Sequence, residues 1–271
     1  MFKGVLKEQA VQVGIGFVLI VVLLGTFILP EWMSNNFMYG LSRGLAVLGL
    51  MILWRTNLVS FGHALFYGFG AYAVAIAQKY LGITDIFLRV IIAIVAAGLL
   101  GFVLGFILRK YREIFFAMLS LAFSMVLYGL LAKAEFLGST DGMSISPSTI
   151  FGFELGRFGL FYFIGFIVIL SLIFAHCYLR SSLGHLTTAI SDNEIRVEYL
   201  GYSVEKAIHI KYVISACLAG GAGGLMAASL GQVDPDSMVL WSVSGELVFV
   251  TIMSGLGNIL APFVGAIFFE F

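Results

Sequence analysis

The sequence predicts an all-α integral membrane protein with about eight transmembrane segments. The first observation is composition: 61% of the 271 residues are hydrophobic and only 11% are charged, whereas soluble globular proteins carry about 25% charged residues. The second is a series of long stretches that contain no Asp, Glu, Lys or Arg. A bilayer core of roughly 30 Å requires about 20 apolar residues in a helix. Lipid must therefore surround most of the chain.

Seven charge-free stretches follow one another along the chain: 9–29, 56–78, 90–108, 114–132, 158–179, 212–233 and 247–269. An eighth apolar stretch, 32–54, is interrupted only by Arg43. Strands of a membrane barrel would instead alternate polar and apolar residues over about ten positions. Lys3 and Lys7 precede the first stretch, as in a signal peptide. That stretch is long enough to span the membrane, and no small-residue cleavage site follows it, so we expect an uncleaved first helix.

The distribution of Lys and Arg predicts that the N-terminus is cytoplasmic, because short cytoplasmic loops carry an excess of both residues. This orientation places ten of the fifteen in the cytoplasm: Lys3, Lys7, Arg55, Arg109, Lys110, Arg112, Arg180, Arg196, Lys206 and Lys211. The whole chain, 1–271, then forms a single transmembrane domain with two long connections. The first, Lys133–Arg157, is an ordered external loop, and the second, Arg180–Lys211, is cytoplasmic.

The stretch 57–70 is expected to contain a broken or re-entrant helix. Asn57, Ser60, Gly62 and His63 bring polar or helix-weakening residues to the start of an otherwise apolar run. Exposed backbone at membrane depth must be satisfied by protein or by a water-filled cavity, and broken helices often line substrate routes. These four residues are therefore candidates for a translocation pathway.

The cytoplasmic connection contains the most polar part of the chain, Thr187–Leu200, which predicts one short amphipathic helix outside the bilayer. Ser191 or Asp192 provides a cap, and Gly201 provides a stop signal. A helix that rests on the membrane surface is the alternative. The polar side carries both signs of charge instead of many Lys and Arg, which favours docking to a protein.

Glycines inside the stretches predict close helix packing. Two G-x-x-x-G pairs occur, Gly101 with Gly105 and Gly220 with Gly224. Small residues let helices in lipid approach closely and gain van der Waals contacts.

Arg43 and Glu246 lie inside predicted spans, where ionisable groups are expensive and often functional. They are interpreted either as a pair at a polar constriction of a pathway, or as two separate groups near the headgroups, with Arg43 snorkelling.

No catalytic set is recognisable. The chain has no G-x-x-x-x-G-K-[ST] phosphate loop, no H-E-x-x-H and no nucleophile elbow. The four histidines have no metal-ligand spacing, and Cys177 and Cys217 lie in predicted spans, so no disulfide framework is implied. The formal net charge of zero argues against a nucleic-acid partner. We therefore expect neither an enzyme nor a resident metal or cofactor in this chain.

Four segments of the chain follow one another as a recognisable set. They are Ser60–Ala64 with Gly68–Tyr72, Gly138–Met143, Ala189–Glu194 with Leu200-Gly201, and Gly255–Gly257 with Pro262 and Gly265-Ala266. In this order they resemble the S-L/F-G-H-A…G-x-G-A-Y stretch, the external T-G-G-x-D-G-L, the A-I-R-D-N-E…L-G loop and the G-G-x-G-T-x-x-G-P-x-x-G-A ending of one family. That family is the branched-chain amino acid ABC transporter permease family of the LivM type.

The resemblance implies an ABC-importer permease fold in the bacterial inner membrane. It also implies a heterodimer with a second permease, two cytoplasmic ATPases that bind ATP and Mg²⁺, and an external solute-binding protein. The polar helix would be the coupling helix that docks on an ATPase, and its coupling residues would be Asp192, Asn193, Glu194, Arg196 and Glu198.

The sequence departs from the family pattern at several positions. Ser191 replaces an Arg, Ser139 and Ser254 replace glycines, and Asn258 and Ala261 replace Thr and Gly. The substrate therefore stays open between branched-chain amino acids and urea, amides or aromatic compounds. The family usually continues for another membrane segment after the position of Phe271, so the chain is expected to be truncated or unusually short. A secondary transporter or channel is the rival class, disfavoured because only Arg43 and Glu246 are charged at mid-membrane.

Overall fold

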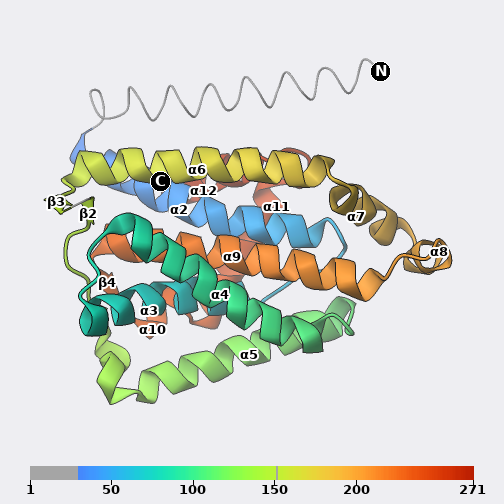
Figure 1. Ribbon diagram of the computed structural model, residues 1–271, viewed down its shortest axis with the longest axis horizontal. Helices are drawn as coiled ribbons and strands as arrows, with labels where there is room; N and C mark the ends of the chain where they lie inside the picture. Colours follow the sequence, from blue (N-terminus) through green and yellow to red (C-terminus); the bar gives the residue numbers. More distant parts are fainter. Residues whose placement is uncertain (1–29, 151) are drawn as a thin grey trace.

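The structure, a computed structural model, describes residues 30–150 and 152–271, and most of them are helical (Figure 1). Six helical segments in this part of the chain are long and apolar enough to cross a membrane, which makes the protein a multi-pass membrane protein. They are α2 (Glu31–Trp54), α4 (Ile86–Leu108), α5 (Glu113–Lys133), α6 (Arg157–Arg180), α9 (Val204–Leu230) and the segment Pro235–Ser254. The predicted first helix, 9–29, lies outside the described residues.

The long helices run between two ends of the molecule (Figure 1). One, the strand end, holds two small antiparallel sheets, in which β1 (Met143–Ser144) pairs with β4 (Gln232–Val233) and β2 (Thr149–Ile150) with β3 (Phe153–Glu154). The 3₁₀ turns η1 (Glu135–Leu137) and η2 (Ser139–Asp141) precede them. The other, the α8 end, holds the short helices α7 (Ser182–Asp192) and α8 (Glu194–Tyr199).

Helix α9 lies at the centre of the bundle and packs against α2, α4 and α3 (His63–Leu81). Helices α4, α5 and α6 are peripheral and expose large apolar side chains: Phe115, Leu130 and Leu170 are among the exposed ones. Such faces suit lipid. By contrast, most residues of α2 are buried.

The predicted span 247–269 is wrong as a single helix. Helix α11 (Trp241–Ser254) ends where Gly255 adopts a φ of 76°, and α12 (Ala261–Glu270) begins after a six-residue connection with Pro262 in its first turn. Phe271 contacts the rings of Trp32 and Phe37, so α12 returns along α2 toward the strand end. A second break precedes α11, after the one-turn helix α10 (Pro235–Met238). The count of eight segments is therefore not confirmed.

The break expected within 57–70 lies at its beginning. Helix α2 ends at Trp54, the chain turns back into the bundle without helical structure, and α3 is regular from His63 onward. Asn57 has a φ of 59°, a left-handed conformation that Asn tolerates better than most residues. Leu58, Ser60 and Gly62 are buried, so this non-helical stretch lies inside protein, as the lipid environment requires.

The single amphipathic helix predicted over Thr187–Leu200 is also wrong in detail. The chain forms two helices separated by Asn193, whose side-chain oxygen accepts a hydrogen bond from the backbone N–H of Arg196 at 2.9 Å and so caps α8. Helix α7 begins earlier than expected, at Ser182, with Ser181 as its cap. Asn193, not Ser191 or Asp192, is therefore the cap that starts the second helix.

Candidate functional site

Helix α8 extends beyond the ends of the long helices (Figure 1), and apolar side chains on it and just after it are exposed. Ile195 is 65% exposed and Tyr199 88%, and Leu200 and Tyr202 just after the helix are also exposed. Val197 alone on α8 is buried. These four exposed residues, Ile195, Tyr199, Leu200 and Tyr202, are called the α8 tip below. An exposed aromatic and aliphatic group of this kind on a short protruding helix is typical of a protein-docking surface.

Helix α8 is held to the membrane domain by an ion pair with the α4–α5 connection. The Nε of Arg112 lies 2.8 and 3.0 Å from the two carboxylate oxygens of Glu194. Beside it, Arg109 pairs with Glu205 at 3.4 Å. Glu194, one of the predicted coupling residues, is therefore engaged within the chain. Asp192, Asn193, Arg196 and Glu198 are exposed.

Helix α7 contacts the helix break after α2, and that break contacts the break after α11. The side-chain amide of Asn57 donates to the carbonyl of Ser191 on α7 at 3.1 Å. Arg55, in the same break, donates to the carbonyl of Leu256 in the break after α11 at 2.7 Å. Burial lowers the pKa of the Arg55 guanidinium. Residues of α7 and of both breaks line a polar cavity of about 340 Å³, so a displacement of α7 would act on the break after α2 and, through it, on the break after α11.

The predicted pathway residues Ser60, Gly62 and His63 are buried, and His63 takes part in a polar contact between four helices, α2, α3, α9 and α11. His63 Nε2 lies 2.7 Å from the hydroxyl of Ser215, which donates to the carbonyl of Gly49 at 2.6 Å. The adjacent N–H of Ala64 donates to the hydroxyl of Ser244. In this conformation His63 joins α3 to α2 and α9. Its role in a pathway stays a prediction.

The structure brings Arg43 and Glu246 together and adds a second carboxylate. Arg43 Nη1 lies 3.2 Å from Glu246 Oε2 and 3.0 Å from Glu270 Oε1. The side chains of Arg43 and Glu270 are 16% and 15% exposed, whereas that of Glu246 is 39% exposed. The Arg43 guanidinium also lies over the ring of Phe269, 5.4 Å from its centre. With two carboxylates and one guanidinium, this cluster has a formal charge of −1.

The four packing glycines lie at one interface, between α4 and α9. A Cβ on Gly101 would lie 2.5 Å from the Cβ of Ala216, and one on Gly105 would lie 2.9 Å from the ring of His209. On the opposite side of the same interface, Gly220 and Gly224 face the small side chains of α4. Each glycine thus stands where a side chain would meet the neighbouring helix.

Two elements of this site were not recognised in the sequence. Glu270 was missed because it follows the stretch that was assigned to one straight span. The α8 tip could not be predicted because the sequence does not show which apolar residues of the cytoplasmic connection stay exposed; the aromatic residues Tyr199 and Tyr202 beside its charged residues are the signal that could have indicated it. Among residues 30–150 and 152–271, no group of three or more His, Cys, Asp or Glu residues could hold a metal ion.

Comparisons with known proteins identify a family and several relatives that the chain resembles in sequence. The family described as "Branched-chain amino acid transport system / permease component" matches residues 32–271. The chain is 30% identical over 250 residues to the high-affinity branched-chain amino acid transport system permease protein LivM of Escherichia coli (strain K12). It is 29% identical, also over 250 residues, to the LivM of Salmonella typhimurium. In both cases the match covers 82% of this chain and 58% of the relative, so the chain spans little more than half of these relatives.

A more distant relative is the probable branched-chain amino acid transport permease protein LivH of Methanocaldococcus jannaschii. It is 25% identical over 240 residues, which cover 82% of this chain and 72% of the relative. No solved structure matches the chain significantly.

Proposed function

Because the chain belongs to the family of branched-chain amino acid transport permeases, we propose that it forms half of the translocation pathway of a bacterial ABC importer for branched-chain, hydrophobic amino acids. It carries out no reaction itself. Separate ATPase subunits bind and hydrolyse ATP-Mg, and their closure switches the permease between outward and inward openings.

The protruding α8 supports this proposal most directly. An importer driven by separate ATPases must transmit their movement through a surface outside the bilayer. Helices α7 and α8 are the outermost elements of the α8 end (Figure 1), and the α8 tip offers apolar anchors for a groove on an ATPase. Seven basic residues lie at this end: Arg55, Arg109, Lys110, Arg112, Arg180, Arg196 and Lys206. Their excess favours a cytoplasmic location for the α8 end, with the protein in the bacterial inner membrane.

The α8 tip should be required for binding the ATPases. We expect Tyr199→Ala to reduce the amount of ATPase that co-purifies with the permease on the order of tenfold, because aromatic anchors dominate the energy of many interfaces. Phe153→Ala is the matched control, since Phe153 is 81% exposed but lies at the strand end. Undiminished co-purification of the ATPases with the Tyr199→Ala variant would disprove the docking role.

The ion pair between Arg112 and Glu194 should transmit movement from α8 to α4 and α5. Glu194→Arg replaces the attraction with repulsion. A partly exposed ion pair contributes up to about 1 kcal/mol, which corresponds to about a fivefold change in an equilibrium, so we expect uptake to fall by about fivefold. Uptake per molecule of folded permease is the measurement. The swapped variant Arg112→Glu/Glu194→Arg should recover most of the loss. Glu154→Arg, which reverses an exposed charge on β3 at the strand end, controls for a general effect of charge. A swapped variant as impaired as Glu194→Arg would contradict this role.

The helix breaks provide the places where the permease changes shape. The bond from Asn57 to Ser191 joins the break after α2 to α7, and the bond from Arg55 to Leu256 joins the same break to the break after α11. Rotation at these non-helical segments moves α3, α11 and α12 without breaking the long helices. In this mechanism His63, Ser60 and Gly62 exchange buried contacts for exposure to the pathway.

The face of α11 and α12 that carries Glu246 would lie against the second permease or along the pathway between the two subunits. Its carboxylate is partly exposed at membrane depth and belongs to a cluster of net negative charge. Contact with acyl chains would be costly for such a group. A basic group of the second permease, or the ammonium group of a transported amino acid, would compensate the charge.

The substrate class separates this proposal from its alternatives. An importer of urea or other amides would share the same architecture, and the ligand bound by the solute-binding protein distinguishes the two. That protein would dock at the strand end, where the external loop 133–157 is folded into strands and 3₁₀ turns. A secondary transporter or channel is a different class, and it would purify without ATPase subunits.

A further inference from the structure

Arg55 is a cation without a counterion at the α8 end. Within the described residues its guanidinium donates one hydrogen bond, from Nη2 to the carbonyl of Leu256, and its Nε is buried without an acceptor. A charged group that is partly removed from water is costly unless an opposite charge accepts its N–H groups. Four other arginines of the described residues do pair with a carboxylate: Arg43, Arg109, Arg112 and Arg157. An anionic ligand at Arg55 would supply the missing counterion.

The polar cavity that Arg55 lines, called the Arg55 cavity below, has the size and the chemistry to hold such a ligand. Its volume of about 340 Å³ lies within the usual range of small-molecule sites, about 300–1,000 Å³. Thr188 and Ser191 of α7 bring hydroxyl groups to its lining, and Asn57 brings an amide. No carboxylate side chain lines the Arg55 cavity, so nothing in its lining repels an anion.

An apolar pocket of about 220 Å³, called the α11 pocket below, adjoins the Arg55 cavity, since Trp54 and Leu256 line both. The rest of its lining comes from α11 and the break that follows it. Ile252 in this lining is 62% exposed, so the α11 pocket opens on the outer surface of the bundle. Six residues separate Ile252 from Glu246, which places the two about 120° apart around α11. The α11 pocket therefore lies away from the face proposed to meet the second permease.

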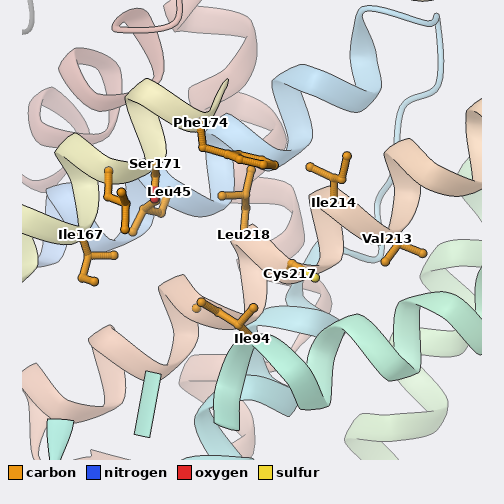
Figure 2. A pocket seen from close by; sticks show the side chains of 11 residues that line it. Leu45, Ile94, Ile167, Ser171, Phe174, Val213, Ile214, Cys217 and Leu218 are labelled. Atoms are coloured by element: carbon orange, nitrogen blue, oxygen red, sulfur yellow. The ribbon is translucent and has the colours of Figure 1, made fainter. Parts of the chain in front are cut away.

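The groove between α6 and α9 lacks this combination of charge and apolar surface (Figure 2). Its volume is about 470 Å³, and side chains such as Phe174 and Ile214 line it, with Ser171 as its one hydroxyl group. Any acyl chain of the bilayer suits such a groove equally well. The pair formed by the Arg55 cavity and the α11 pocket is selective, because an occupant must carry a negative charge at one end and hydrocarbon at the other.

We propose that the Arg55 cavity and the α11 pocket together bind an anionic phospholipid, with its phosphodiester at Arg55 and part of one acyl chain beside Ile252. The planar fork of a guanidinium matches two phosphate oxygens. Trp54 ends α2, and Trp is common at the level of the lipid headgroups. A free phosphate or a carboxylate of a partner protein would satisfy Arg55 but leave the α11 pocket empty.

A lipid in this position would contact both helix breaks. Its phosphate would lie at the break after α2, and its acyl chain would lie along α11 to the break that begins at Gly255. The bond from Arg55 to Leu256 already joins the two breaks. The lipid would therefore stabilise the conformation in which they are in contact.

Photo-labelling of the permease in its native assembly tests this site. The assembly is placed in nanodiscs of phosphatidylcholine and titrated with a phosphatidylglycerol that carries a diazirine in one acyl chain. On irradiation, we expect saturable labelling of the peptide that contains position 252, and weaker, non-saturating labelling by the phosphatidylcholine analogue. Arg55→Gln should raise the lipid concentration for half-maximal labelling about tenfold, because it removes the charge and the fork of donors. Lys110→Gln is the matched control, since it removes an exposed charge at the same end that lines neither cavity nor pocket.

A second variant tests the acyl chain while Arg55 stays in place. Ile252→Trp narrows the α11 pocket and should weaken the saturable labelling severalfold. Val264→Trp is its control, because Val264 is 63% exposed but does not line the α11 pocket. Inorganic phosphate at the concentration of the lipid should not displace the label.

The proposal is overturned if Arg55→Gln labels like the unaltered chain, or if phosphatidylcholine labels position 252 as well as phosphatidylglycerol does. Displacement by inorganic phosphate, or an unchanged affinity in Ile252→Trp, would indicate a small anion and equally overturn it. Because Ile252 is a surface residue, its variant decides the question even if Arg55→Gln fails to fold. Neither measurement depends on the transported substrate or on ATP hydrolysis.

Discussion

Replacement of Arg43 by leucine should cost the permease most of its folded, active population. Arg43 is the only cation in contact with Glu246 and Glu270 within the described residues, and its removal leaves two carboxylates unpaired at membrane depth. Breaking a buried ion pair by removing one partner costs about 3–5 kcal/mol. The lower end of that range applies because Glu246 is partly exposed. The yield of monodisperse protein in detergent and its thermal stability measure the loss.

Removal of the carboxylates should reverse the defect. We expect Arg43→Leu/Glu246→Gln/Glu270→Gln to recover most of the stability, since no uncompensated charge remains. Glu246→Gln alone should stay folded, because Glu270 still pairs with Arg43, but it should reduce uptake if this face lines the pathway. A stability of Arg43→Leu equal to that of the unaltered chain would show that the cluster is hydrated and contributes nothing to folding.

The contact of Glu270 with Arg43 could not be predicted from the sequence. Arg43 and Glu246 could be paired because both are charges inside apolar stretches, and the structure brings them into contact. In one straight helix, Glu270 would lie about 36 Å from Glu246. The break at Gly255 instead reverses the chain and returns Glu270 to the same guanidinium. Glycines in a membrane helix are common, so the sequence did not reveal which of them ends one.

The long helices could be predicted because a long stretch without charged residues indicates a segment surrounded by lipid. The stretch 90–108 differs from α4 only at its start, at Ile86. The charge-free criterion excluded Arg89, yet Arg89 is part of the helix and fully buried. Its guanidinium donates to the carbonyls of Ile83 and Ser146 and to the side chain of Gln78. Ser146 is 57 residues away in the chain, and Gln78 and Ile83 precede the helix, so a count of charges along one segment could not find this set of acceptors.

The helical character of the segment Thr187–Leu200 was predicted, but its division into α7 and α8 was not. Its polarity predicts a position outside the bilayer, and the family resemblance implies a partner there; both stay predictions. Periodicity alone did not indicate that Asn193 would divide it, or that Glu194 would turn back to Arg112. Because Glu194 is paired with Arg112 inside the chain, we proposed exposed apolar residues such as Tyr199, not the charged ones, as the anchors for a partner.

The second large effect is expected at the glycine run of α9. A Cβ on Gly223 would collide with the backbone carbonyl of Tyr67 on α3, and one on Gly220 would collide with the side chain of Ala97 on α4. The run therefore lets two helices contact the α9 backbone from two sides. Gly223→Leu must push α3 away from α9, because the obstructing atom belongs to the backbone and cannot rotate aside. Overpacking of this kind costs at least about 1–3 kcal/mol, so we expect little folded protein.

Gly129→Leu is the matched control for that substitution. Gly129 is also a helical glycine in a membrane span, on α5, and nothing lies within 4 Å of a Cβ built there. Both variants add the same side chain and lose the same backbone freedom, so a difference in thermal stability reports contact with α3 alone. If both variants unfold at the same temperature, α3 and α9 do not approach as closely as the structure places them. A lower midpoint confined to Gly223→Leu shows that the small residues position the helix that begins at His63.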